Sequence, residues 1–576
     1  IMLRRIFSYM KEYKKYAWLA LICIGVEVVL EIMVPKLMAD LIDIGVTNSD
    51  VPYIINKGIQ MAVCAVAALI LGVGSARFFA LAGQGLGANI RKAEYEKLQS
   101  YSFSNIDHFS VSSLVTRLTS DVTNIQNAVS TGMRPFGRSL VMLIFATTLA
   151  FQINSTLALV FLVALPVLAV LLIIIIINVG PRYGRMQGAV DLVNRCIEEN
   201  LTAVRVVKSY VRGDYEIEKF RNVNDNLKNE SEKAFGIAVL NMPAMQFVMY
   251  STILGILLIG GRLINSGQMM IGQLTSFLSY VLLILNSLMM MSNVFLLMTR
   301  SLASAERIMK VIDEPIDITD ENAKDIEVKK GEIEFNHVWF KYNETAKEYV
   351  LSDVSFHINA GQTVGIIGQT GSSKTTLIQL IPRLYDASKG EIKIDGINVK
   401  EYPVRHLRDA ISVVLQKNTL FSGSLIDNLR WGDENATLDE IKEACSIACV
   451  DEFIDRLPGG LDAEMGQEGV NVSGGQKQRI CIARAILKKP KVLILDDSTS
   501  AVDTATEGKI RNALAKKLPD MTKIIIAQRI SSVCHADQII IMDGGRVDAI
   551  GTHESLLRTN KIYQEIYESQ KEGADL

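Results

Sequence analysis

The residues with the most specific chemistry in this 576-residue chain form a glycine-rich run at positions 368–376. The run reads Gly368, Gln369, Thr370, Gly371, Ser372, Ser373, Lys374, Thr375 and Thr376. An apolar strand pattern at 361–368 and a helix pattern at 377–384 flank it, which is the setting of a phosphate-binding loop. Backbone N–H groups at a helix N-terminus attract phosphates. We expect Lys374 to meet the outer phosphates and Thr375 to offer its hydroxyl to Mg²⁺.

One position in this loop departs from the usual pattern. Ser373 stands where glycine normally precedes the lysine. Serine is small, and we expect it to fit there if its backbone angles stay helical. On that expectation, nucleotide binding survives the change.

A second motif is an apolar run at 492–495 that ends in two acids, Asp496 and Asp497. The run predicts a strand that lies beside the phosphate loop in a parallel sheet. Such a strand delivers a carboxylate to Mg²⁺, and Asp496 fits that role. Two motifs in this order are far more specific than a glycine-rich loop alone.

A third motif opens a helix pattern just ahead of the acidic strand, where two glycines and a serine form another anion site. Its residues are Ser473, Gly474, Gly475 and Gln476. With this motif the sequence resembles the ATP-binding-cassette family, whose signature is Ser-Gly-Gly-Gln. Further marks of that family are Tyr342, Gln416 and the run Ser500, Ala501, Val502 and Asp503.

The resemblance implies a role for each mark. Tyr342 would stack on adenine, and the 500–503 run would cross to a partner domain. Gln416 would reach Mg²⁺ and the attacking water, so the Mg²⁺ ligands would be Thr375, Gln416 and Asp496. The expected ligands are therefore ATP and Mg²⁺. The first 300 residues hold six apolar segments long enough to span a membrane, and six spans ahead of one cassette resemble the exporter branch, specifically half-transporters that work as dimers.

Two residues differ from the family at the chemistry itself. Asp497 stands where the family has the glutamate that acts as general base, and aspartate is one methylene shorter. A base must lie about 2.6–3.2 Å from its proton partner, directly or through one water. Gln528 stands where the family has histidine; it can still hydrogen-bond the γ-phosphate, but it cannot become positively charged.

These two differences predict that the chain's own site binds ATP and hydrolyses it poorly. In this family two cassettes sandwich two ATP molecules, each between one subunit's phosphate loop and the other's signature. The intact signature at 473–476 would then serve a partner that carries glutamate and histidine, which implies a heterodimer. The alternative is a homodimer with slow turnover.

The elements that must position these residues fall into two halves of the chain. The sequence is 49% hydrophobic, and long apolar runs crowd its first 300 residues. A bilayer core needs about 20 apolar residues per helix, and six segments qualify. They lie near 16–36, 59–82, 137–154, 157–180, 237–261 and 273–298.

Basic residues predict the orientation of these spans. They precede the first span and fill the connections at 83–136 and 181–236, whereas the opposite loops carry little beyond Lys57 and Arg262. The positive-inside rule then places both termini, both connections and the cassette in the cytoplasm of a multi-pass protein of the cell membrane. Each connection predicts a helical extension with a break, near 105–110 and near 212–214, where a short cross-helix would contact a neighbouring domain.

A few charged residues lie within the spans. Glu27 and Glu31 are one helical turn apart on the first span, and Arg77 lies on the second. Charges at that depth usually face a bundle interior or a hydrated cavity. Either a substrate pathway or a structural ion pair would account for them.

The predicted fold class is therefore a membrane α-helical bundle of six spans with long cytoplasmic extensions, followed by an α/β P-loop nucleotide-binding domain. The predicted boundaries are 1–312 for the membrane domain, 313–330 for an acidic linker and 331–576 for the cassette. A net charge of −2 argues against a nucleic-acid partner. The expected partners are a second half-transporter subunit, the lipid bilayer and a small hydrophobic or peptide substrate.

The sequence predicts an ATPase-coupled exporter of a drug, lipid or peptide, and it does not name the cargo. An ATP-gated channel or membrane-bound regulator is the competing class. An importer usually keeps spans and cassette on separate chains, so the fused layout speaks against it.

Overall fold

The structure is a computed structural model that describes residues 2–497 and 502–572, and its contacts divide the chain into two units. The helical unit comprises residues 1–99 and 111–314. The α/β unit comprises residues 100–110 and 315–576. The segment 100–110, which the sequence analysis placed in the membrane domain, thus groups with the α/β unit.

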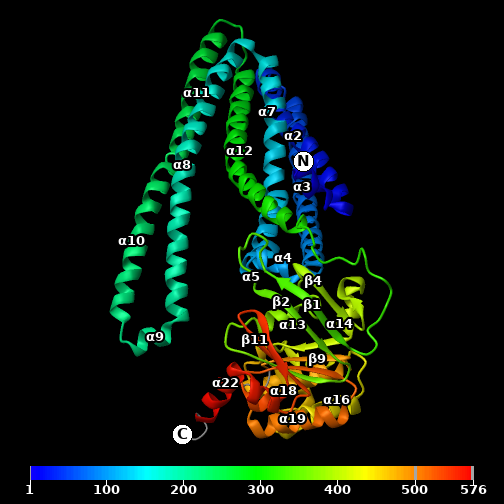
Figure 1. Ribbon diagram of the computed structural model, residues 1–576. Coiled ribbons are helices and arrows are strands. Elements are labelled where there is room, and N and C mark those ends of the chain that lie inside the picture. Colours follow the sequence, from blue (N-terminus) through cyan, green and yellow to red (C-terminus); the bar gives the residue numbers. More distant parts are fainter. Residues whose placement is uncertain (1, 498–501, 573–576) are drawn as a thin grey trace. The chain divides into compact units, whose positions relative to one another are not determined.

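The helical unit contains long and short helices, and three of them, α3, α8 and α12, run well past the predicted spans (Figure 1). Its helices are α1 (Met2–Ser8), α2 (Lys14–Asp40), α3 (Val51–Gln99), α5 (Val111–Thr116), α6 (Val122–Asn127), α7 (Met133–Ile153), α8 (Ser155–Thr202), α9 (Val204–Ser209), α10 (Gly213–Ala238), α11 (Asn241–Asn265) and α12 (Ile271–Ile312). The break predicted near 212–214 lies at the start of α10, and the short helix α9 lies just before it.

Five helical segments of the described chain are long and apolar enough to cross a membrane. They are Lys11–Val46, Val51–Gln99, Val111–Ile153, Gly213–Asn265 and Ile271–Met291. The remaining predicted span, 157–180, lies within α8, where several side chains fall outside the described part. The predicted fold class of a helical membrane bundle is confirmed.

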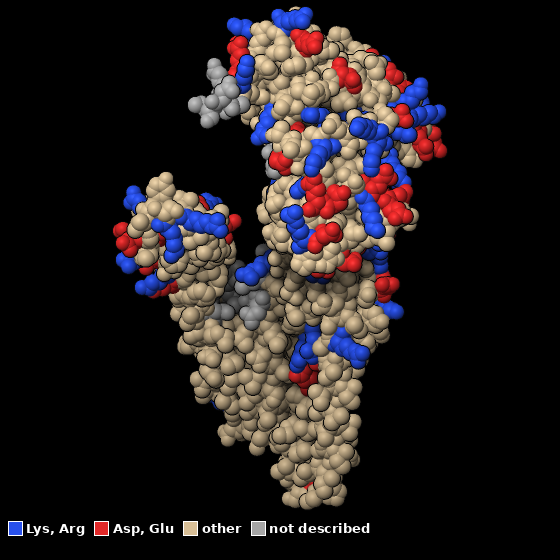
Figure 2. Space-filling model, turned by 90° about the horizontal axis from the view of Figure 1, so that it is seen from below, with Lys and Arg blue, Asp and Glu red and all other residues tan. Residues whose placement is uncertain are grey.

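The helices of this unit turn apolar side chains both inward and outward. Ile24, Phe79 and Tyr280 are fully buried, and the Tyr280 hydroxyl donates to the carbonyl of Ile32 at 3.0 Å. Ile22 and Leu69 are mostly exposed. Figure 2 shows a broad tan surface over these helices, interrupted by only a few charged side chains. An apolar exterior of this kind suits lipid rather than water.

Local chemistry explains the sharp turn between α7 and α8. Asn154 alone separates the two helices, and its side-chain oxygen accepts hydrogen bonds from the backbone N–H groups of Thr156 and Leu157 at 3.0 and 3.1 Å. Those groups would otherwise be unpaired at the N-terminus of α8.

The α/β unit contains two main sheets. The antiparallel sheet has the order β2-β1-β4-β5, from β1 (Ile333–Phe340), β2 (Leu351–Ile358), β4 (Lys389–Ile394) and β5 (Ile397–Asn398). The six-stranded sheet has the order β12-β11-β3-β10-β9-β6, from β3 (Thr363–Ile367), β6 (Ile411–Val414), β9 (Val492–Asp496), β10 (Thr522–Ile526), β11 (Gln538–Asp543) and β12 (Arg546–Gly551). The short strands β7 (Gly423–Ser424) and β8 (Glu464–Met465) pair with each other.

In the six-stranded sheet β12 pairs antiparallel, and the other described pairings are parallel. Every residue of β9 and β10 is buried, as expected for inner strands of a parallel sheet covered on both faces. The sequence predicted that the acidic strand lies beside the phosphate loop in a parallel sheet, and β9 lies in the same sheet as β3. β10 lies between β3 and β9, and the two motifs still meet because their strands end at the same edge.

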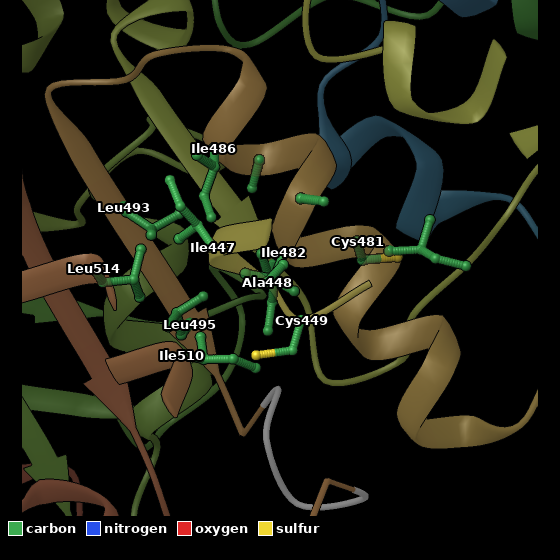
Figure 3. Packing of buried hydrophobic residues seen from close by; sticks show 14 of the residues in the cluster. Ile447, Ala448, Cys449, Cys481, Ile482, Ile486, Leu493, Leu495, Ile510 and Leu514 are labelled. Carbon is green, nitrogen blue, oxygen red and sulfur yellow. The ribbon is translucent and has the colours of Figure 1, made fainter. Parts of the chain in front are cut away.

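Helices of the α/β unit pack on the sheets or on one another. They are α4 (Phe103–His108), α13 (Lys374–Gln379), α14 (Val404–Asp409), α15 (Leu425–Arg430), α16 (Leu438–Ile447), α17 (Asp451–Ile454), α18 (Gly474–Leu487), α19 (Thr504–Lys517), α20 (Ile530–Val533), α21 (His553–Thr559) and α22 (Lys561–Glu572). Figure 3 shows one core, in which Ile482 of α18 and Leu514 of α19 lie with Leu493 of β9. This core fixes α18, which begins at the signature, against the strand that carries the two acids.

Candidate functional site

The phosphate loop connects β3 to α13, so its backbone ends at a helix N-terminus; the helix spans Lys374–Gln379 rather than the predicted 377–384. The ammonium of Lys374 donates to the carbonyls of Gly368 and Gln369 at 2.8 and 2.9 Å and lies 3.2 Å from the Ser372 hydroxyl. Burial lowers the pKa of Lys374, while the carboxylates of Asp496 and Asp497 act in the opposite direction. The loop thus holds its cation in place among backbone oxygens.

The loop borders a cavity of about 340 Å³. Its lining brings together most of the predicted nucleotide residues: Thr370, Gly371, Ser372, Ser373, Lys374, Thr375, Thr376, Gln416, Asp496, Asp497 and Gln528, with Ile526. Residues from four separate parts of the sequence therefore share one site.

The backbone of Ser373 contradicts the condition that we set for it. Its φ of 66° and ψ of 25° are left-handed rather than right-handed helical. A residue with a Cβ is strained there by roughly 1–2 kcal/mol, which explains why glycine suits this position. The strain falls on the residue just before Lys374 and the first turn of α13.

Asp496, at the end of β9, has the chemistry of a Mg²⁺ ligand. Its side chain is 2% exposed, and one carboxylate oxygen accepts from the Thr375 hydroxyl at 3.3 Å. The other oxygen, Oδ2, is buried without a hydrogen-bond partner among the described residues. Burial raises the pKa of Asp496, and the Thr375 hydroxyl opposes the rise. A buried oxygen lacking a donor, next to a hydroxyl, fits a hard cation such as Mg²⁺.

Asp497 lies beside the two amides that the sequence analysis assigned to the hydrolytic step. Its Oδ2 accepts from Gln528 Nε2 at 3.0 Å and from Gln416 Nε2 at 3.5 Å. Its backbone N–H donates to the carbonyl of Ile526 at 2.9 Å, and its φ of 46° is left-handed. Burial raises the pKa of Asp497, whereas the two amides lower it. The short carboxylate is therefore held by neighbouring protein groups.

Tyr342, the expected adenine platform, lies at the far end of the loop. Its hydroxyl is 2.9 Å from the Thr376 hydroxyl and donates to Gln379 Oε1 at 3.2 Å. Its ring meets that of Tyr385 edge-on, with centroids 5.2 Å apart. Almost half of Tyr342 is exposed, so part of the residue is accessible to a ligand.

Sequence reasoning missed Tyr385 and its partner Asp107. The Tyr385 hydroxyl donates to Asp107 Oδ2 at 2.7 Å, and its ring packs near Phe103. Asp107 and Phe103 belong to α4, the short helix at the predicted break near 105–110. The break was predictable, but nothing in the local pattern links residue 107 to residue 385. Tyr385 thus joins α4 to the ring expected to hold adenine.

The signature residues lie apart from the cavity that the phosphate loop lines. Ser473 caps α18: its hydroxyl accepts from the Gln476 N–H at 3.3 Å, and Gln476 Oε1 accepts from the Ser473 N–H at 2.9 Å. Gly474 and Gly475 form the first helical turn. This reciprocal cap holds the start of α18 in a fixed shape.

The run expected to cross to a partner is only partly described. Ser500 and Ala501 lie outside the described residues. Val502 is buried, and Asp503 caps α19 by accepting from the Thr506 N–H at 2.9 Å.

Comparisons with known proteins agree with this geometry. The family described as ABC transporter transmembrane region matches residues 17–288, and the family described as ABC transporter matches residues 351–500. An uncharacterized ABC transporter ATP-binding protein of Bacillus subtilis, YfiB, is 37% identical over 100% of both chains. The ATP-dependent lipid A-core flippase of Pseudomonas putida is 32% identical over 98% of this chain and 95% of its own.

Among solved structures, a bacterial Atm1-family ABC exporter with ATP bound has a TM-score of 0.83 and 22% sequence identity. The match covers 97% of this chain and 98% of that one. The two proteins therefore share their fold over both units of this chain. The chain therefore belongs to the ABC transporter family, as an exporter-type half-transporter that carries a membrane region and an ATP-binding region together.

Proposed function

We propose that this chain is one subunit of a heterodimeric exporter that moves a hydrophobic or amphipathic molecule out of the cytoplasm by alternating access. Its own site holds ATP and splits it slowly, while residues 473–476 complete the catalytic site of the partner subunit. The observation that carries the proposal is the engagement of Asp497 by the side-chain amides of Gln528 and Gln416.

The chemistry of hydrolysis gives this observation its weight. A general base needs a free lone pair within about 2.6–3.2 Å of the attacking water or one water away. Asp497 is one methylene shorter than glutamate, and Gln528 already donates to its Oδ2. Gln528 also has no proton that titrates near neutral pH. The groups that would bind ATP are thus present, whereas the groups that would hydrolyse it are weakened.

The phosphate side of the site supports ATP binding. Lys374 and the loop backbone would hold the phosphates, and Thr375, Gln416 and Asp496 would hold Mg²⁺, which neutralises phosphate charge when bound. ATP contacting both cassettes favours the closed pair by its differential affinity for that state. Loss of the γ-phosphate contacts at the partner's competent site would reset the dimer.

A cavity in the helical unit supports an amphipathic cargo. It measures about 740 Å³ and combines apolar side chains such as Val34 and Leu69 with two acids and two guanidinium groups. Glu27 is nearly buried, Arg138 lies 2.6 Å from Glu31, and Arg134 lies 3.4 Å from Glu27. Apolar walls around paired charges suit a molecule with a polar head and an apolar body. A relative named for lipid A-core transport fits the same class.

The test is ATP turnover by this chain purified alone and with any half-transporter that co-purifies. We expect slow phosphate release from the chain alone and fast release from the pair. Brisk turnover by the chain alone, in a symmetric pair of identical subunits, would contradict the heterodimer. Slow turnover with substrate transport by the chain alone would favour the slow homodimer.

Inverted membrane vesicles distinguish export from the competing function. An exporter accumulates substrate against a gradient when ATP is added, whereas an ATP-gated channel only equilibrates it. Uptake that stops at equal concentrations would replace the exporter by the channel. The same vesicles, treated with protease from outside, test the predicted cytoplasmic cassette and cell-membrane orientation.

A further inference from the structure

The last described helix, α22, is anchored to the α/β unit by its apolar face. Tyr563 is fully buried, and Ile562 and Ile566 pack against the same core. The Tyr563 hydroxyl lies 2.7 Å from His553 Nδ1. Because these contacts fix the helix, they also fix the polar side chains that it carries toward its C-terminal end.

One of those side chains clamps the loop between β10 and α20. Gln570 Nε2 donates to the carbonyl of Gln528 at 2.7 Å, and Gln570 Oε1 accepts from the N–H of Ile530 at 2.9 Å. A single side-chain amide thus pairs with the backbone on both sides of Arg529, as a neighbouring β-strand would. Only one orientation of the amide satisfies a donor and an acceptor together.

Gln570 supplies a hydrogen bond to this loop that the N-cap residue Arg529 does not supply. Arg529 is the N-cap of α20, and its side chain makes no capping hydrogen bond. The N–H of Ile530, in the first turn of that helix, would otherwise lack a partner. Gln570 supplies this partner across 40 residues of sequence.

The clamped loop carries Gln528, whose side chain reaches the reacting region. Gln528 Nε2 donates to Asp497 Oδ2 at 3.0 Å, and Gln528 also lines the cavity of the phosphate loop. On its other side, Gln528 lines a second cavity of about 930 Å³ together with Asp497, Arg529 and Gln570. Gln570 therefore holds the backbone of a residue that lines the cavity of the phosphate loop.

We infer that Gln570 is a positioning residue for the nucleotide site, which sets through the Gln528 backbone how firmly the Gln528 side chain holds the γ-phosphate. This inference rests on the proposed contact between Gln528 and that phosphate. The C-terminal helix then becomes part of the machinery that retains ATP.

The experiment measures release of a fluorescent ATP analogue, MANT-ATP, from the full-length chain in detergent with Mg²⁺. Gln570→Ala should raise the release rate about five-fold, the order expected from losing a hydrogen-bonded support. Gln528→Ala should raise it at least as much. The double variant should release no faster than Gln528→Ala alone, because Gln570 acts through that residue.

The chain offers a matched control on the same helix. Gln564 Nε2 donates to the carbonyl of Leu557 in α21 at 2.7 Å, so Gln564→Ala removes a similar bond that does not touch the loop. It should leave the release rate unchanged. A merely structural role for Gln570 would lower the unfolding temperature without changing release, or would change release equally in Gln564→Ala.

The outcomes separate this inference from the proposed function. Additive effects of Gln570→Ala and Gln528→Ala would overturn the positioning role alone. An effect of Gln570→Ala without any effect of Gln528→Ala would also overturn it. No effect of either variant would overturn both the positioning role and the γ-phosphate contact.

Discussion

The nucleotide site has two sides that differ in how their charged groups are engaged. On the binding side, Lys374 lies among loop oxygens, and one oxygen of Asp496 is buried without a described donor. On the hydrolytic side, the Asp497 carboxylate is held by the amides of Gln528 and Gln416. The cation and the buried acid expected to bind ATP are Lys374 and Asp496, whereas the shortened base is Asp497, so hydrolysis can weaken while binding persists. The comparison is tested most directly by changing each side separately.

The largest effect should come from restoring the hydrolytic side. The double change Asp497→Glu with Gln528→His lengthens the carboxylate and supplies an imidazole. Because a positioned general base contributes roughly 10²–10⁴-fold, we expect phosphate release by the chain alone to rise about 100-fold. The measurement is Mg²⁺-dependent ATP turnover in detergent, with Gln564→His as a control for an added histidine. Unchanged turnover would show that the slow step lies elsewhere.

The next effect concerns the binding side. Lys374→Ala removes the cation that we expect on the outer phosphates. A hydrogen bond to a charged group contributes about 1.5–3 kcal/mol, so the dissociation constant for ATP should rise roughly 30-fold. Calorimetric titration measures it, and Lys442→Ala on the exposed face of α16 serves as control. An unchanged affinity would place ATP outside this loop.

The sequence predicted the features that depend on short local patterns or on where parallel strands end. The strand, loop and helix around Lys374 follow from glycine spacing, and Asp496 reaches the same site because parallel strands end at one edge. The place of β10 between β3 and β9 was not predictable, because strand order is decided by packing between distant segments. The Tyr385–Asp107 bond and the Gln570 clamp likewise join residues far apart in the chain. The left-handed Ser373 shows tertiary geometry overriding the preference of a residue.

A smaller effect should separate stability from Mg²⁺ binding at Asp496. Burial raises the pKa of Asp496 above its unfolded value of about 3.9, so the ionised form is disfavoured in the folded state. The folded state then holds the proton more tightly, and stability falls as pH rises through the folded pKa. Asp496→Asn removes this cost.

We therefore expect the nucleotide-free Asp496→Asn variant to gain about 1 kcal/mol of stability at pH 7. The gain should vanish below about pH 4, where the native carboxyl is protonated in both states. Thermal unfolding in detergent at both pH values measures the difference. Asp543→Asn, at the exposed end of β11, should gain nothing. The same Asp496 variant should lose the dependence of ATP affinity on Mg²⁺, which an exclusively structural acid would leave intact.

The smallest effect should come from Ser373→Gly, which changes the backbone cost of the binding side without touching its charges. The left-handed conformation costs a residue with a Cβ roughly 1–2 kcal/mol, a strain that glycine does not have. Glycine loses more conformational entropy on folding, which offsets about 0.5–1 kcal/mol of this gain in stability. Because we expect ATP to bind the left-handed form of the loop, a net gain of about 0.5 kcal/mol in that form should tighten ATP binding about two-fold.

Ser372→Gly is the matched control: Ser372 is not left-handed, and its hydroxyl lies 3.2 Å from the Lys374 ammonium. That control should weaken both stability and binding, because it adds freedom to the unfolded chain and removes a contact. Equal effects of the two changes would mean that the left-handed backbone of Ser373 does not limit the binding side.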